Sequence, residues 1–114
     1  MNDQEKINYL EFQSPDLPAT KAFFQKAFGW TFTDYGPDYV SFSDGRLHGG
    51  FAKSDAVSGL PPLVVVYSKD LAATQARIEA AGGRIVEPVF EFPGGRRFHF
   101  SDPVGNVLAV WSEQ

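Results

Sequence analysis

Few side chains in this 114-residue sequence are suited to proton transfer near neutral pH, because it holds two histidines and no cysteine. The lack of cysteine excludes disulfides, thiolate catalysis and cysteine-ligated zinc. A histidine beside a carboxylate can act as a general acid or base, and we single out His99 with Glu11 for that role. Tyr9, Tyr67 or Arg97 could donate a hydrogen bond to the oxyanion formed when a proton moves next to a carbonyl.

A repeat with an offset of 54 residues is the strongest pattern in the sequence. Residues 14–30 and 68–84 are identical at eight of seventeen aligned positions, where about one match would arise by chance. Both copies contain Ser-x-Asp-Leu, in which Asp16 and Asp70 are suited to cap a following helix. The repeat predicts two copies of one unit. Since one copy cannot cover its own sheet face, the two must pack together within a chain or across a dimer.

Each copy has the periodicity of a strand, a helix and three further strands. Residues 54–61 lack periodicity and predict a linker. The chain is therefore expected to form one domain over 1–114, with module one at 5–53 and module two at 62–114. The expected strands lie near 7–13, 30–35, 38–43, 47–53, 63–68, 84–91, 96–101 and 107–112, and the expected helices over 17–28 and 71–81.

The last predicted hairpin determines which side of its strands His99 occupies. Pairing across the turn of residues 102–106 sets Phe100 near Leu108 and His99 near Ala109. His99 and Ala109 then share one face, while Phe100 and Leu108 face the helices. Strand alternation predicts that this first face carries Tyr9, Val65, Tyr67, His99 and Trp111, a mix of aromatic walls and few polar tips.

The composition is that of a globular domain, with 43% hydrophobic residues, 15% aromatic residues and a net charge of −4. A mildly acidic surface argues against nucleic acid or an anionic membrane as a partner. The N-terminus lacks the basic and apolar regions of a signal peptide. We therefore expect a cytoplasmic protein.

Four short motifs carry a family resemblance: residues 14–17 (SPDL), 21–24 (KAFF), 28–30 (FGW) and 98–106 (FHFSDPVGN). Their order resembles the vicinal oxygen chelate superfamily, which includes glyoxalase I, bleomycin-resistance proteins and extradiol dioxygenases, and within it a glyoxalase-related group of uncertain activity. The resemblance implies an α+β fold of two βαβββ modules whose curved mixed sheets enclose a small-molecule cavity. It also implies a homodimer.

Metal-dependent members of that superfamily place four ligands on the cavity face. The resemblance puts the matching positions at Tyr9, Gly49, Leu63 and Ala109. None of these supplies the imidazole nitrogen or carboxylate oxygen that such metals need, so no metal or other cofactor is expected. The metal route of glyoxalase I is therefore not expected either.

A rebuilt two-histidine, one-carboxylate metal set from His48, His99 and Glu11 remains an alternative, although its spacing matches no known ligand motif.

Three functions remain open on this basis. The first is a glyoxalase-like protein that binds a small organic ligand through Tyr9, Tyr67, His99, Trp111 and Arg97. The second is a lyase- or isomerase-type enzyme of the superfamily, related to lactoylglutathione lyase, that uses His99 and Glu11 or the rebuilt metal site. The third is a structural dimer whose cavity is filled by side chains. A change of His99 or Glu11 should abolish activity in an enzyme, whereas a binding protein needs no titrating group.

Overall fold

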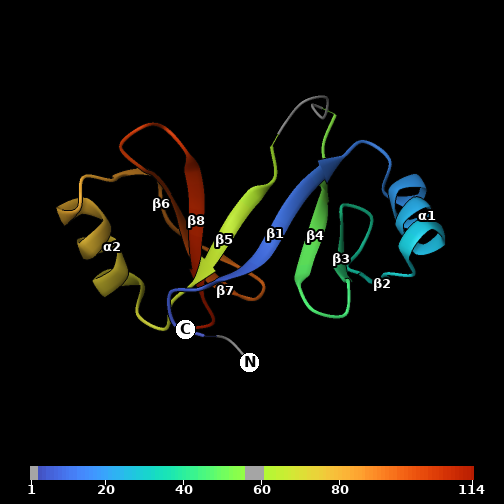
Figure 1. Ribbon diagram of the computed structural model, residues 1–114, viewed down its shortest axis with the longest axis horizontal. Coiled ribbons are helices and arrows are strands. Elements are labelled where there is room, and N and C mark those ends of the chain that lie inside the picture. Colours follow the sequence, from blue (N-terminus) through green and yellow to red (C-terminus); the bar gives the residue numbers. More distant parts are fainter. Residues whose placement is uncertain (1–2, 56–60) are drawn as a thin grey trace. The chain divides into compact units, whose positions relative to one another are not determined.

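The computed structural model describes residues 3–55 and 61–114, which fall into two compact units (Figure 1). We call Tyr9–Pro62 the N-terminal unit. Leu63–Gln114 together with Met1–Asn8 form the C-terminal unit. Most of the expected linker, residues 56–60, lies outside the described residues.

Within the described residues, two helices and eight strands in the order βαβββ followed by βαβββ confirm the predicted α+β class. The elements are β1 (Ile7–Ser14), α1 (Leu17–Phe28), β2 (Thr31–Asp34), β3 (Tyr39–Ser43), β4 (His48–Lys53), β5 (Leu63–Tyr67), α2 (Leu71–Ala80), β6 (Arg84–Phe92), β7 (Gly95–Ser101) and β8 (Val107–Ser112).

The strands of each unit form the same mixed arrangement. In the N-terminal unit the order is β2-β3-β4-β1, with β1 parallel to β4 and the other pairs antiparallel. In the C-terminal unit the order is β5-β8-β7-β6, with β5 parallel to β8. The repeat seen in the sequence is therefore a repeat of topology.

Both helices begin where the sequence predicts, because an aspartate caps each of them. The Asp16 carboxylate accepts a hydrogen bond from the backbone N–H of Ala19, and Asp70 does the same for Ala73. Helix α1 ends at Gly29, whose φ of 72° is a left-handed conformation that glycine adopts without strain.

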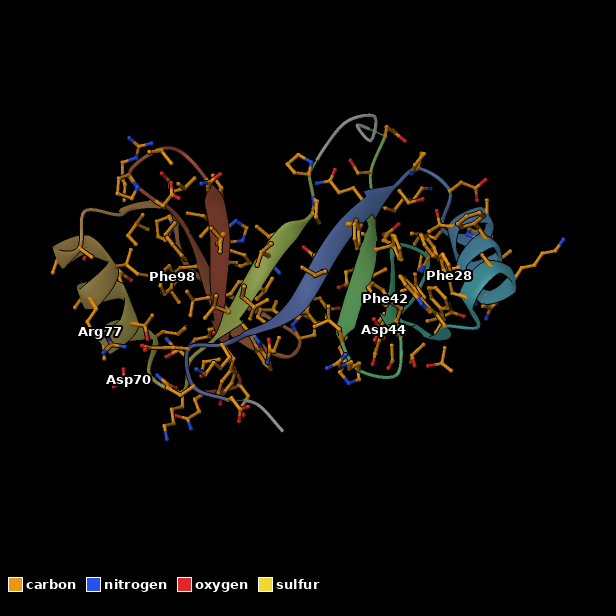
Figure 2. All side chains as sticks on the ribbon, viewed as in Figure 1. Phe28, Phe42, Asp44, Asp70, Arg77 and Phe98 are labelled. Atoms are coloured by element: carbon orange, nitrogen blue, oxygen red, sulfur yellow. The ribbon has the colours of Figure 1, made fainter. Side chains whose placement is uncertain are left out.

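Each unit packs its helix on one sheet face around an apolar cluster. In the N-terminal unit Leu17, Val40, Phe42 and Phe51 are buried, and Trp30 stacks on Phe42 with ring centroids 4.7 Å apart. In the C-terminal unit the cluster comprises Leu71, Phe98 and Val110 with Val66, Ile78, Ile85 and Phe100 against it. Phe42 and Phe98 lie in these clusters (Figure 2). The other face of each sheet carries Glu11 and His48 in the N-terminal unit and Arg97 and His99 in the C-terminal unit.

Residues before β1 belong to the C-terminal unit. The backbone N–H of Glu5 donates to the Tyr67 carbonyl, and the Tyr67 N–H donates to the carbonyl of Lys6. The Glu5 carboxylate also forms an ion pair with Arg77 of α2 and accepts a hydrogen bond from Thr74.

Neither helix within the described residues is long and apolar enough to cross a membrane.

Candidate functional site

The helix-free face of the C-terminal unit carries a row of large side chains across all four of its strands. In register, Tyr67 of β5 lies opposite Trp111 of β8, Trp111 lies opposite Arg97 of β7, and Arg97 lies opposite Phe90 of β6. We call these four residues the cross-strand row. Paired residues on adjacent strands point to the same face, so the row forms one continuous surface.

Two aromatic members of the row, Tyr67 and Trp111, contact each other, and Trp111 also contacts Phe92. The ring centroids of Tyr67 and Trp111 are 5.2 Å apart in an edge-on arrangement, and those of Phe92 and Trp111 are 6.3 Å apart. The indole N–H of Trp111 donates to the side-chain oxygen of Asn8 at 3.1 Å. The Trp111 ring is thus held at its edge and its polar end, which favours one fixed orientation of its face.

Arg97 lies over two of these rings. Its guanidinium carbon is 5.4 Å from the Phe90 ring centroid and 5.7 Å from that of Phe92. Cation–π contacts of this kind hold a planar guanidinium in place, and its fork of N–H groups matches a carboxylate. The side chain is half-buried.

Tyr67 is 5% exposed, and its hydroxyl donates a hydrogen bond to Glu113. This hydrogen bond raises the pKa of the Tyr67 phenol and lowers the pKa of the Glu113 carboxyl. Because little of its surface is open, Tyr67 mainly supports Trp111 from one side.

His99 lies where the hairpin argument predicts, opposite Ala109 and on the helix-free face. Phe100 is confirmed on the other face, where it packs against the cluster beneath α2. The His99 ring is half-buried, with its centroid 5.7 Å from that of Phe90. Glu87 of β6 lies opposite His99 in register, so a carboxylate-bearing residue neighbours the imidazole on this face.

The N-terminal unit has its own polar group of residues on the helix-free face. The hydroxyls of Tyr9 and Tyr39 are hydrogen-bonded, and the Tyr39 hydroxyl donates to Glu11 Oε2 at 3.1 Å. Burial, with the hydrogen bond to Tyr9 and the nearby charge of Glu11, raises the pKa of Tyr39 well above its usual range. His48 is exposed at the start of β4, opposite Tyr9.

The proposed proton-transfer pair is divided between the units, since Glu11 belongs to the N-terminal unit and His99 to the C-terminal one. Their joint action therefore stays a prediction. Tyr9 is likewise in the N-terminal unit, whereas the other predicted ligand-binding residues, Tyr67, Arg97, His99 and Trp111, share one face of the C-terminal unit.

The strand register identifies the counterparts of the predicted metal positions. Glu11 lies opposite Gly50 in the N-terminal unit, as Val65 lies opposite Ala109 in the C-terminal unit. Gly50 is therefore the counterpart of Ala109. The sequence analysis predicts Gly49, one residue earlier, for this position. Gly49 points to the helix side, where an added Cβ would lie 2.4 Å from the Phe42 ring.

These positions do not suit a metal ion. Leu63 and Ala109 have no donor atom, Gly50 has no side chain, and the Tyr9 phenol is hydrogen-bonded to Tyr39. Within residues 3–55 and 61–114, no three or more histidine, aspartate and glutamate side chains gather closely enough to hold an ion.

A cavity of about 270 Å³ lies on the helix side of the C-terminal unit, where it is lined by Val66, Ile78 and Phe100. Its polar lining residues, Glu5, Thr74 and Arg77, bond to one another. The cavity therefore has an apolar wall, and its polar lining residues are already bonded to one another. Arg97, His99 and Trp111 lie on the opposite face of the sheet.

Sequence reasoning missed several residues of these groups, among them Tyr39, Phe90, Phe92, Asn8 and Glu113. Alternation in residues 39–43 (YVSFS) does place Tyr39 with two serines on the polar side, which is a usable signal. The register of β6 shifts between Ile85 and Glu87 and again before Phe90, so counting alternate residues cannot predict the face of Phe90.

The family model of the Glyoxalase/Bleomycin resistance protein/Dioxygenase superfamily matches residues 6–110. The chain is also 32% identical over 124 aligned residues to the anthracycline biosynthesis protein DnrV of Streptomyces peucetius, with 90% of this chain and 45% of DnrV covered. The chain thus spans about half the length of the curated relatives it matches.

Solved structures share the fold at low identity. The Mn(II)-bound glyoxalase from Novosphingobium aromaticivorans matches with a TM-score of 0.69 and 20% identity, over 99% of this chain and 40% of that one. A methylmalonyl-CoA epimerase from Streptomyces coelicolor, in complex with 2-nitronate-propionyl-CoA, matches with a TM-score of 0.74 and 14% identity, over 96% and 98% of the two chains.

With this architecture and a family model that covers most of its length, the chain belongs to the Glyoxalase/Bleomycin resistance protein/Dioxygenase superfamily. The resemblance noted from the motifs is confirmed.

Proposed function

We propose that this protein binds a flat organic molecule bearing an anionic oxygen, on the helix-free face of the C-terminal unit. The observation that carries the proposal is the cross-strand row, in which Arg97 lies among aromatic rings on one face. The ligand's ring packs against Trp111, and its carboxylate or phenolate oxygen accepts hydrogen bonds from Arg97.

The arrangement of these residues supports binding of such a ligand. Trp111 is oriented by Tyr67 and Asn8, and Arg97 is oriented by Phe90 and Phe92. Less side-chain freedom is then lost when a ligand binds, which favours affinity. His99 adds a second polar tip beside Phe90.

The similarity to DnrV supports the ligand class, because that protein is named for anthracycline biosynthesis and anthracyclines are fused-ring aromatic compounds. The same surface suits other planar ring systems with one acidic oxygen.

The test is a titration with 2-naphthoate, followed by the indole N–H signal of Trp111 in NMR spectra. We expect the wild-type signal to move with added 2-naphthoate, and Arg97→Gln to weaken binding about tenfold or more, since a hydrogen bond to a charged group contributes roughly 1.5–3 kcal/mol. The neutral methyl ester should bind equally to both proteins.

Arg96→Gln is the matched control, because Arg96 is the adjacent strand residue and points to the other face, where it donates to the backbone oxygen of Gln114. Equal 2-naphthoate affinity in the wild type and Arg97→Gln, or a Trp111 signal that never moves, would contradict the proposal.

A further inference from the structure

The cavity between α2 and the sheet lies where the N-terminal unit has phenyl rings. Three residues that line the cavity are aliphatic, and their counterparts in the N-terminal unit are phenylalanines; the pairs are Val66 with Phe12, Ile78 with Phe24, and Val110 with Phe51. The first two pairs are separated by the repeat offset of 54 residues. The third follows from strand register, because the members of the first pair lie directly opposite the members of the third.

The difference in side-chain size explains the cavity. In the N-terminal unit the Phe51 ring packs on those of Phe12 and Phe24, with centroid distances of 5.3 and 5.5 Å. The aliphatic side chains at the matching positions are smaller, and a cavity of about 270 Å³ lies beside them. An apolar cavity of about 150 Å³ is enough to bind benzene, so this one has room for a single ring or a short chain. The exposed residues Arg77 and Ala81 at its rim show that it opens to solvent.

The polar side of this cavity is arranged to hold a carboxylate. Thr74 is only 6% exposed, and it donates its one hydroxyl proton to Glu5 Oε2 at 2.8 Å. Ser68 therefore donates the 2.8 Å hydrogen bond that joins its hydroxyl to that of Thr74. The Arg77 guanidinium forms an ion pair with the same oxygen of Glu5 (Figure 2). A hydroxyl donor and a guanidinium thus converge on one carboxylate oxygen.

The arginine distinguishes this site from the matching place in the N-terminal unit. That unit has the same pair of hydroxyls, those of Ser14 and Thr20, at a distance of 2.7 Å. The position that matches Arg77 is Phe23, which is 58% exposed. The pair of hydroxyls is therefore part of the shared start of both helices, whereas the arginine occurs in the unit where the cavity lies.

Glu5 occupies the site with a strained backbone. Its φ of 56° is in the left-handed region, and among the described residues it is the only one other than glycine with a positive φ. A residue with a Cβ adopts this conformation unfavourably, and the strain persists only where other contacts hold it. These contacts are the bonds of the carboxylate to Thr74 and Arg77 and the N–H bond to the Tyr67 carbonyl. If a ligand replaces the Glu5 carboxylate, Glu5 can leave the strained conformation, which favours the exchange.

We propose that this cavity binds a small carboxylate with one ring or a short apolar chain, and that the ligand's carboxylate replaces that of Glu5 against Thr74 and Arg77. The segment before β1 thereby acts as an internal competitor for the site. The cavity lies on the helix side of the sheet, whereas Arg97 lies on the other face. The proposal therefore goes beyond the function proposed above and does not depend on it.

The test follows phenylacetate binding by the methyl NMR signals of Val66 and Val110, which line the cavity. Glu5→Gly removes the competing carboxylate, and glycine keeps the left-handed conformation without strain. We expect phenylacetate to shift these signals and to bind Glu5→Gly at least tenfold more tightly than the wild type. Neutral phenylacetamide, which has the same ring, should show no such gain.

Glu5→Gln gives the same comparison with the shape of the side chain retained and its charge removed. It should bind phenylacetate at least threefold more tightly than the wild type, because a neutral amide competes less well for Arg77.

Two substitutions in the Glu5→Gly chain then separate the charge from the space. Arg77→Gln removes the cation and should weaken phenylacetate binding about tenfold or more. Ile78→Phe restores the ring that Phe24 supplies in the N-terminal unit, so it should fill the cavity and abolish the methyl shifts.

Arg84→Gln in the same Glu5→Gly chain is the matched control, because Arg84 is exposed at the start of β6 and does not line the cavity. It should leave the affinity for phenylacetate unchanged. Equal affinity of the wild type, Glu5→Gly and Glu5→Gln, each with the amide spectrum of a folded chain, overturns the proposal, and so does a gain that phenylacetamide shares. Loss of 2-naphthoate binding in Arg97→Gln tests the other face of the sheet and leaves this result unaffected.

Discussion

The carboxylate of Asp102 organises the turn that connects β7 and β8. One of its oxygens accepts the backbone N–H groups of Val104 and Asn106 at 3.0 and 2.9 Å, and the other accepts the Asn106 side-chain amide at 2.7 Å. The side chain of Asn106, followed by the backbone N–H groups, lowers the pKa of Asp102. These bonds fix the register that sets His99 opposite Ala109.

A carboxyl whose pKa is lowered on folding stabilises the fold above its ordinary pKa, and this contribution is lost as the pH falls through the lowered value. We therefore expect Asp102→Asn to be less stable than the wild type at pH 6, and the difference to narrow from about pH 4 downwards. Urea unfolding at pH 6 and pH 3 measures this. In Asn106→Ala the NMR-detected pKa of Asp102 should rise, and an unchanged value would contradict the assignment.

At the scale of elements, the start of each helix is built from the same four-residue pattern. The hydroxyls of Ser14 and Thr20 lie 2.7 Å apart, and those of Ser68 and Thr74 lie 2.8 Å apart. Each serine oxygen also accepts the backbone N–H of the capping aspartate. The repeated Ser-x-Asp-Leu is thus a structural motif that fixes where the helix leaves its strand.

Removal of either cap should destabilise the protein by similar amounts. We expect Asp16→Ala and Asp70→Ala each to lower the free energy of unfolding by about 1 kcal/mol, because each leaves a helix N–H without its partner. Glu79→Ala, at an exposed position late in α2, is the control and should change it by less than about 0.5 kcal/mol. Chemical denaturation measures all three, and a cap variant as stable as the control would refute the shared role.

At the scale of the whole molecule, the C-terminal unit is built from two separate stretches of sequence. Residues 3–8, the last two of which begin β1, precede the N-terminal unit in sequence but are grouped with β5 and α2. Backbone bonds to Tyr67, the ion pair of Glu5 with Arg77 and the bond of Gln4 to Ser68 account for this grouping.

A chain shortened to begin at Ile7 should therefore lose stability in the C-terminal unit, most of which is far from the deleted residues in sequence. We expect faster hydrogen exchange at the Tyr67 amide, which loses the Lys6 carbonyl, and across α2, which loses Glu5. Exchange in α1 and β3 should stay unchanged. Mass spectrometry of exchange in the two chains measures this, and equal acceleration in both units would argue against the assignment.

The sequence by itself determined the elements, their order and the family, because these depend on local signals: the alternation in residues 7–13, the caps at Asp16 and Asp70, and the turn at residues 102–106. It also determined that His99 shares a face with Ala109, since a tight turn sets the register of its hairpin. Only the tertiary structure brought Tyr39 to Glu11 and put Arg97 between Phe90 and Trp111. The contact of Tyr39 with Glu11 and the pairing of β1 with β4 join strands that are not consecutive in sequence, so no local pattern encodes them. Arg97 and Phe90 lie on consecutive strands, but the irregular register of β6 prevents their pairing from being counted along the chain.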